Sequence, residues 1–174
     1  MDVYGYDPFV SSERAQQLQV KLSELKKLFA ESDYVTLHLP RTSETENLVD
    51  MKVLKSMKNN AKLINCARGG IIDEEALAEA LNNSLIGGAA IDVFSEEPLS
   101  SHSPLLKVDK NLILTPHLGA STREAQENVA VDVAEQIRDV LLGLSARTAV
   151  NIPGLSPDIM DSLKPHLQLA ETMG

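Results

Sequence analysis

The fold is decided by residues 62–81, which read KLINCARGGIIDEEALAEAL. Residues 62–66 are typical of a buried strand, and Arg68, Gly69 and Gly70 follow directly. A glycine pair lets the backbone turn sharply and approach a ligand closely. Asp73 is a good N-cap for a helix over residues 74–81. The stretch therefore predicts a strand, a tight turn and a helix, the unit from which parallel sheets are built.

The same alternation of strand and helix extends along the chain in both directions. Further strands are predicted at residues 3–6, 34–38 (of the buried type), 86–93 and 111–115, with Pro8 ending the first of them. Helices are predicted to about residue 17 with Ser12 as the cap, after a cap at Ser23, and from Asp50. A long helix is predicted from Ser121 to about residue 142, where Ser121 and Glu124 have capping-box spacing. The long helix carries an apolar stripe of Ala125, Val129, Val133, Ile137 and Leu141. The predicted fold class is α/β, a Rossmann-like doubly wound parallel sheet.

The C-terminal part of the chain has a different pattern. Asn151-Ile152-Pro153-Gly154 is predicted to break the structure, so we expect one domain over residues 1–150 and a separate segment over 151–174. Residues 157–174 are amphipathic, and Pro165 fits the first position of a terminal helix.

Composition excludes several classes of function. The 174 residues carry a formal net charge of −9, which argues against a nucleic-acid binder, because such proteins neutralise phosphates with Lys and Arg. A small anionic ligand remains compatible with this charge. The one cysteine, Cys66, cannot form an intramolecular disulfide, and no apolar run approaches the roughly 18 residues that a membrane span needs. No Cys/His metal spacing is present, and we predict a soluble, intracellular protein without a metal site.

Residues that could carry chemistry follow successive predicted strands. Asp7 follows the first, Arg68 the third, Glu97 the fourth and His117 the fifth, while His38 ends the second. Each alone could be an ordinary loop residue. Ligands of such sheets bind beyond the carboxyl ends of the strands, where these side chains converge. Arginine can clamp a carboxylate, histidine can accept a hydroxyl proton, and glutamate can orient and charge the histidine, which is what oxidation of a 2-hydroxy acid by a nicotinamide requires.

Three segments resemble the signatures of the D-2-hydroxyacid dehydrogenase family. They are Asn65-Cys66-Ala67-Arg68-Gly69-Gly70-Ile71-Ile72-Asp73, then Asp92-Val93-Phe94 with Glu96-Glu97-Pro98-Leu99, and Pro116-His117-Leu118-Gly119-Ala120-Ser121-Thr122. The stretch from Asp33 through Val35-Thr36-Leu37-His38-Leu39-Pro40 to Thr45 is similar to the family's segment beneath the cofactor. The resemblance covers nearly the whole chain.

The resemblance implies a role for each matched residue. Arg68 would bind the substrate, Glu97 would orient and charge His117, and His117 would be the catalytic acid and base. NAD would be the cofactor, contacted by Asp7, Leu39, Cys66, Ala67, Arg68, Asp92, His117, Gly119 and Ala120. Leu39 departs from the family, which often has threonine there. Asp7 is expected to favour NAD over NADP, because its charge repels a 2′-phosphate.

Within the family, the sequences Cys-Ala-Arg-Gly-Gly and His-Leu-Gly-Ala-Ser-Thr are most similar to those of the phosphoglycerate dehydrogenases. This implies oxidation of the small molecule 3-phosphoglycerate to 3-phosphohydroxypyruvate, which begins serine synthesis, in a homo-oligomer. A cytoplasmic location is expected, or an organelle if a transit peptide precedes Met1. Other members of the family remain open, namely glyoxylate/hydroxypyruvate reductase, D-lactate dehydrogenase and erythronate-4-phosphate dehydrogenase. Formate dehydrogenase is disfavoured, because a glutamine partners its histidine. A non-catalytic corepressor-like NAD-binding module is a further alternative.

Two features of the family are not found in this sequence. The first strand with its G-x-G-x-x-G loop would lie before Met1, and residues 151–174 resemble the segment that crosses back into the substrate domain. The predicted sheet is therefore incomplete, with unpaired strand edges that favour self-association. The chain alone is expected to bind NAD weakly and not to oxidise phosphoglycerate.

Overall fold

The structure is a computed structural model that describes residues 1–144, 148 and 157–173. The chain divides into two compact units, Met1–Gly119 and Ala120–Gly174. The first unit contains all of the strands found among the described residues.

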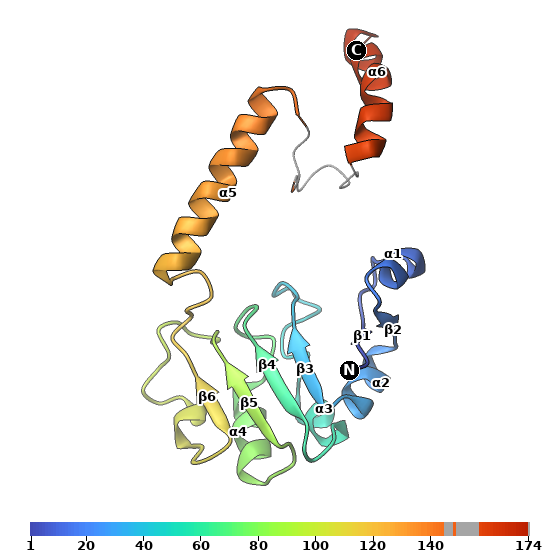
Figure 1. The fold of residues 1–174 in the computed structure, drawn as a ribbon. Helices are drawn as coiled ribbons and strands as arrows, with labels where there is room; N and C mark the ends of the chain where they lie inside the picture. Colours follow the sequence, from blue (N-terminus) through green and yellow to red (C-terminus); the bar gives the residue numbers. More distant parts are fainter. Residues whose placement is uncertain (145–147, 149–156, 174) are drawn as a thin grey trace. The chain divides into compact units, whose positions relative to one another are not determined.

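The first unit is built on a four-stranded sheet in which every strand is parallel to its neighbours (Figure 1). The strands are β3 (Tyr34–Leu37), β4 (Lys62–Asn65), β5 (Gly88–Ile91) and β6 (Leu112–Leu114), in that spatial order. Parallel strands need crossover connections. Helices α3 (Met51–Ser56) and α4 (Glu74–Asn82) and the 3-10 helix η1 (Pro104–Lys107) lie in these connections. The predicted fold class, a Rossmann-like α/β sheet, is confirmed.

An aspartate caps the N-terminus of each of the crossover helices α3 and α4. Asp73 accepts hydrogen bonds from the backbone N–H groups of Glu75 and Ala76 at 3.1 and 3.0 Å. Asp50 accepts one from Val53 at 2.8 Å. The first amides of a helix have no partner within it, so a cap of this kind contributes about 1 kcal/mol. The predicted cap at Asp73 is confirmed, and the helix predicted from Asp50 begins at Met51 with Asp50 as its cap.

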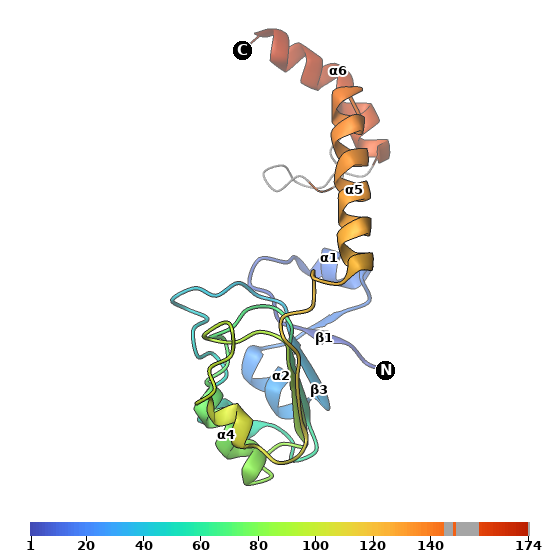
Figure 2. The same cartoon turned by 90° about the vertical axis from the view of Figure 1, so that its left-hand side faces the viewer.

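The hydrophobic core lies against one face of this sheet. Phe29, Leu54 and Leu77, from three different helices, join Val35 and Leu63 of the strands in a single buried cluster. Figure 2 shows α2 and α4 on the same side of the strands. On the opposite face Tyr34 is 70% exposed, so β3 alternates between exposed and buried positions and is half-buried, not the fully buried strand that was predicted.

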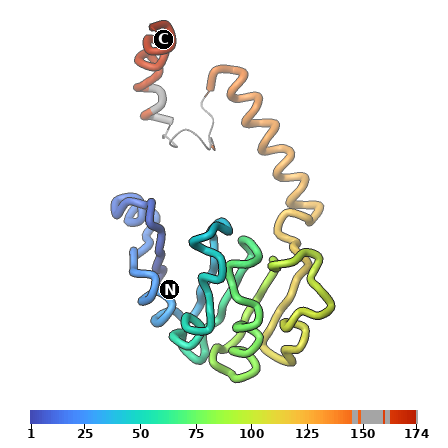
Figure 3. The backbone as a smooth tube through the Cα atoms, turned by 180° about the vertical axis from the view of Figure 1, so that it is seen from behind, coloured from blue at the N-terminus to red at the C-terminus, as the bar shows by residue number. Residues whose placement is uncertain are grey.

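The N-terminal residues form a second, small sheet. Strands β1 (Tyr4–Gly5) and β2 (Lys21–Leu22) pair in parallel around α1 (Ser12–Gln17), and α2 (Leu25–Glu31) leads on to β3, as the tube in Figure 3 traces from behind. The sequence analysis missed β2, which has only two residues and no alternating pattern. The helix caps predicted at Ser12 and Ser23 were also wrong. Ser11 caps α1 through its side chain, and Ser23 instead donates its N–H to Gly5, because it continues the β2 pairing.

The second unit contains α5 (Arg123–Leu141) and α6 (Pro157–Met173). The predicted capping box was wrong, since the side chain of Thr122 accepts from the N–H of Ala125 at 3.1 Å and the helix begins two residues after Ser121. Pro165 lies inside α6 and not at its start. Of the apolar stripe of α5, Val129, Val133, Ile137 and Leu141 are exposed and Ala125 is half-buried. The predicted break at 151–154 lies outside the described residues.

We expect Leu63→Ala to lower the free energy of unfolding by about 2–5 kcal/mol, because Leu63 is fully buried at the centre of the sheet and its loss leaves a cavity. Ile113→Ala is the matched control, since this strand residue is 64% exposed and its loss should change the value by roughly 0.5 kcal/mol or less. Urea unfolding of both variants measures the difference. Equal losses would show that the core does not lie on the face that carries Leu63.

Candidate active site

Glu97 and His117 are in direct contact beyond the carboxyl ends of β5 and β6. The Nδ1 atom of His117 lies 2.7 Å from Oε2 of Glu97, and the other oxygen, Oε1, accepts the backbone N–H of Phe94 at 3.0 Å. A carboxylate only accepts hydrogen bonds, so Nδ1 carries the proton in this pair. In that tautomer a neutral imidazole has its lone pair on Nε2. The pair is thus built to hold a histidine whose Nε2 accepts a proton.

The contact with His117 perturbs Glu97 in turn. The hydrogen bond from the His117 ring, and then that from Phe94 N–H, lowers the pKa of Glu97 below its ordinary value. The Glu97 side chain is 37% exposed, so solvent screens much of this interaction. The carboxylate is therefore held in its charged form as the partner of the histidine, without a large contribution to stability.

A buried carboxylate, Asp92, holds the turn that carries His117. Oδ1 of Asp92 accepts from Thr115 Oγ1 at 2.5 Å and from the N–H of Leu118 at 2.9 Å, and Oδ2 accepts from the N–H of Gly119 at 3.2 Å. Burial raises the pKa of Asp92, but these three hydrogen bonds, together with the charge interaction with His117, hold the pKa below the usual value. His117 itself has a φ of 54°, a left-handed conformation that side chains other than glycine rarely adopt. The turn is thus fixed on both sides of that strained residue.

The loop that carries Arg68 lies against the loop that leads to Glu97. A Cβ atom on Gly69 would stand 1.7 Å from the carbonyl oxygen of Phe94, so only glycine permits this approach. The close approach predicted for the glycine pair is therefore made to protein backbone. Nη1 of Arg68 donates to the carbonyl of Ala67 at 2.6 Å, and within the described part of the chain the guanidinium forms no salt bridge.

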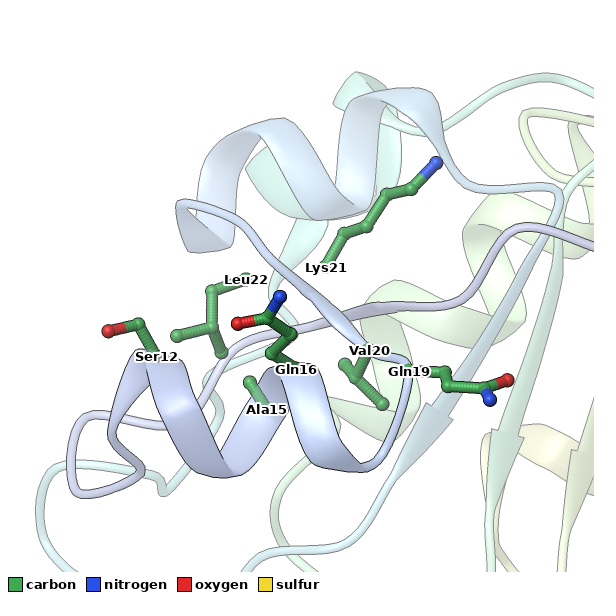
Figure 4. A pocket seen from close by; sticks show the side chains of 7 residues that line it. All are labelled: Ser12, Ala15, Gln16, Gln19, Val20, Lys21 and Leu22. Carbon is green, nitrogen blue, oxygen red and sulfur yellow. The ribbon is translucent and has the colours of Figure 1, made fainter.

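A cavity of about 590 Å³ opens beside the Glu97–His117 pair. Its walls are mostly apolar and are formed by Phe94, Glu97, Pro98, Leu99, Leu106, Leu114, Thr115, Pro116 and His117. This volume is in the range of small-molecule sites. A smaller hollow of about 310 Å³ lies between α1 and β2, and Figure 4 shows the side chains around it, among them Ala15, Val20 and Leu22. It contains none of the residues predicted to be functional.

The remaining predicted residues are placed as follows. Asp7 lies two residues beyond β1, and its Oδ1 accepts the N–H of Phe9 at 2.8 Å, which closes a turn. Leu39 is half-buried against the core, and Cys66 is an exposed free thiol. Ala67 is half-buried, Gly119 contacts Asp92, and Ala120 begins the second unit. The Nε2 atom of His38, which directly follows β3, lies 3.0 Å from Thr36 Oγ1. Their contacts with NAD stay a prediction.

Sequence reasoning gave no individual role to Asn65 or Thr115. Thr115 donates to Asp92 at 2.5 Å, and Asn65, with 1% of its surface exposed, bonds to the loop of Arg68 through both ends of its amide. A signal for Asn65 was present, because asparagine at the end of a strand readily closes a turn with its side chain. Among the described residues, no group of three His, Cys, Asp or Glu side chains could hold a metal ion. In that same part of the chain, every helix is too short or too polar to cross a membrane.

The fold and these residues define an α/β domain with a paired glutamate and histidine at the carboxyl edge of a parallel sheet. Residues 1–119 match the family described as "D-isomer specific 2-hydroxyacid dehydrogenase, NAD binding domain", and the chain belongs to this family. The match covers the first compact unit from end to end.

Named relatives agree with this family. Over all 174 residues the chain is 61% identical to D-3-phosphoglycerate dehydrogenase of Synechocystis sp., covering 31% of that protein, and 48% identical to D-3-phosphoglycerate dehydrogenase of Archaeoglobus fulgidus, covering 33%. The chain thus spans about a third of the length of the curated relatives it matches.

Solved structures show the same fold. D-lactate dehydrogenase with NAD⁺ from Lactobacillus jensenii is similar with a TM-score of 0.69 and 26% identity, over 87% of this chain and 48% of that one. The apo form of D-mandelate dehydrogenase from Rhodotorula graminis gives a TM-score of 0.71 and 27% identity, over 90% and 46% of the two chains. The family and the NAD-bound structure identify NAD as the cofactor.

We expect His117→Ala to raise the pKa of Glu97 toward the ordinary glutamate range of about 4.3, because the largest interaction that lowers it is lost. A titration of the side-chain carboxyl carbon by NMR measures the value, with Glu97→Gln to assign the signal. His102→Ala, which removes an exposed histidine elsewhere, is the control and should leave the Glu97 titration unchanged.

The sign of the coupling also fixes a pH window for stability. The pKa of Glu97 is lower in the folded state than in the unfolded chain, where it is about 4.3. Ionised Glu97 therefore stabilises the folded state at pH values above the unfolded pKa, and this stabilisation is lost as the pH falls through the folded pKa. A Glu97 titration that is the same with and without His117 would show that the two side chains are not coupled in solution.

Proposed function

We propose that the protein is an NAD-dependent dehydrogenase that oxidises 3-phospho-D-glycerate to 3-phosphohydroxypyruvate. The observation that carries this proposal is the 2.7 Å contact between His117 and Glu97, beside a cavity of small-molecule size. The choice of substrate is supported by the 61% identity to a relative named D-3-phosphoglycerate dehydrogenase.

The residues of the first unit fit the place of the cofactor. The loops that follow β4, β5 and β6 all begin at the carboxyl edge of the sheet, where ligands of this fold bind. The exposed Cys66, the half-buried Ala67 and the N–H groups of the turn around His117 lie in these loops. Asp7, beyond β1, supplies a carboxylate for ribose hydroxyls. NAD, when bound, supplies the hydride acceptor.

Each residue of the site then has one task in the reaction. Arg68 holds the carboxylate of the 2-hydroxy acid with its planar fork of donors. Nε2 of His117 takes the proton of the hydroxyl group as the adjacent C–H bond gives up its hydride, and the 2-oxo acid is formed. Glu97 keeps the ring in the required tautomer and stabilises the imidazolium that results. Leu99 and Leu106 give the cavity an apolar wall beside the Glu97–His117 pair.

The proposal is tested by following NADH formation by the purified full-length gene product. The assay uses a panel of D-2-hydroxy acids with and without a phosphate, including 3-phosphoglycerate, D-lactate and D-glycerate. We expect the largest kcat/KM with 3-phosphoglycerate. A preference for D-lactate or D-glycerate would overturn the substrate and leave the dehydrogenase class, and NAD binding without turnover of any acid would indicate a non-catalytic binding module.

We propose further that this reaction begins serine synthesis, that the protein is a homo-oligomer, and that it acts in the cytoplasm. The exposed apolar residues of α5, among them Val129, Val133 and Ile137, support self-association. Sedimentation measures the oligomeric state, and complementation of a serine-requiring strain tests the place in metabolism. Fractionation tests the location, with an organelle as the alternative, because a relative 42% identical is named as chloroplastic.

Substitutions of His117 and Arg68 should separate the tasks of these two residues. We expect His117→Ala to lower kcat by about 10²–10⁴-fold, the usual contribution of a general acid or base. Arg68→Lys should raise the KM of the hydroxy acid roughly tenfold or more, since it loses a bidentate hydrogen bond to the carboxylate. His102→Ala is the control and should match the unchanged protein. Steady-state kinetics at saturating NAD measure all three, and a His117→Ala variant with near-normal kcat would remove His117 from the mechanism.

Asp7→Ala should weaken NAD binding and lower the preference for NAD over NADP about tenfold or more, because the carboxylate no longer repels a 2′-phosphate. Asp2→Ala is the matched control, since Asp2 is a nearby exposed carboxylate paired with Lys21. The ratio of kcat/KM for the two cofactors measures the effect. If this ratio is the same in Asp7→Ala as in Asp2→Ala, Asp7 is not the residue that selects the cofactor.

A further inference from the structure

Asn65 is a polar residue at a place where the sheet is otherwise apolar. It is the last residue of β4, pairs in register with Ile91 of β5 and Leu37 of β3, and has only 1% of its surface exposed. Burying an amide without hydrogen bonds strongly destabilises the folded state, so the hydrogen-bond partners of the Asn65 side chain indicate its role.

Both ends of the Asn65 amide bond to the same short loop. Nδ2 donates to the carbonyl oxygen of Arg68 at 3.0 Å, and Oδ1 accepts the N–H of Ala67 at 3.1 Å. The side chain therefore holds the peptide groups on both sides of the Ala67–Arg68 bond. A loop fixed at both of these groups gives Arg68 one backbone position instead of several.

The backbone of Asn65 ties this loop to the next strand. Its carbonyl oxygen accepts the N–H of Asp92 at 2.9 Å, and the loop packs through Gly69 on the backbone of Phe94. Phe94 in turn donates its N–H to Glu97, which holds His117. The position of Arg68 is thus set relative to the Glu97–His117 pair by a continuous chain of short contacts that starts at Asn65.

We infer that Asn65 is a positioning residue that acts through Arg68 and sets the place of its guanidinium for the carboxylate of the substrate. This inference rests on the proposed function. Asn65 is too deeply buried to touch the substrate itself, so its effect on the reaction must pass through the loop.

Asn65→Asp is the sharpest change to test this role. It keeps the size of the side chain and the oxygen that accepts from Ala67, but it replaces the donor to Arg68 with an oxygen that repels the carbonyl group. We expect the KM of the hydroxy acid to rise roughly tenfold at saturating NAD, with a smaller change in kcat. Asn59→Asp adds the same charge at an exposed asparagine and should change neither value.

A double-mutant cycle with Arg68→Lys then separates an effect through Arg68 from a general loss of structure. If Asn65 acts through Arg68, the double variant should have about the KM of Arg68→Lys alone, because the group being positioned is already lost. If the two increases in KM multiply, Asn65 acts independently of Arg68 and the inference is overturned. Should Asn65→Asp fail to fold, Asn65→Ser, which keeps one hydroxyl for one of the two bonds, takes its place in the cycle.

The outcomes distinguish this inference from the proposed function. A full-length gene product that oxidises no 2-hydroxy acid overturns both. Oxidation of the acid with a KM that Asn65→Asp leaves unchanged overturns only the inference about Asn65. Both are supported if the acid is oxidised, Asn65→Asp raises its KM, and the double variant has about the KM of Arg68→Lys alone.

Discussion

The parallel pairing of β4, β5 and β6 is the constraint on which the site depends. Parallel strands in register end at the same edge, so the residues that follow Asn65, Ile91 and Leu114 emerge side by side. Arg68 and His117 each lie three residues beyond their strands. The register of the strands alone therefore brings these two distant parts of the sequence to the same edge of the sheet. An antiparallel β5 would place Glu97 at the other end of the sheet, and the 2.7 Å contact with His117 could not form.

Two buried polar residues at this edge, Asn65 and Asp92, connect the core to the loops that carry Arg68 and His117. Asn65 ends β4 and Asp92 directly follows β5, and both are buried beside the apolar core. Their side chains form hydrogen bonds with backbone groups of the loops. A buried polar group is stable only when its hydrogen bonds are made, so these loops cannot move without leaving Asn65 or Asp92 unsatisfied. The rigidity of the core is thereby passed to Arg68 and to His117, although both of these side chains are exposed.

The sequence was enough to predict the strands of the main sheet, the cap at Asp73, the helix that follows Asp50, and the contact between Glu97 and His117. These features rest on strong local patterns and on the geometry of parallel sheets. Adjacent serines and threonines were harder, because Ser11 and Ser12, or Ser121 and Thr122, can each cap a helix, and the choice depends on where the preceding chain stops pairing. The strand β2 and the task of Asn65 depend on partners distant in space or on burial, which no local pattern reveals.

The lengths of the three loops explain why Glu97 can serve His117. Arg68 and His117 follow their strands closely, whereas Glu97 comes six residues after Ile91. The longer loop lets the chain turn back, so that one carboxylate oxygen bonds to Phe94 within the same loop and the other points across to His117. A carboxylate anchored by its own loop keeps its direction even though it is partly exposed. The histidine therefore gains an oriented partner at the surface of the cavity, where a small substrate can reach its ring.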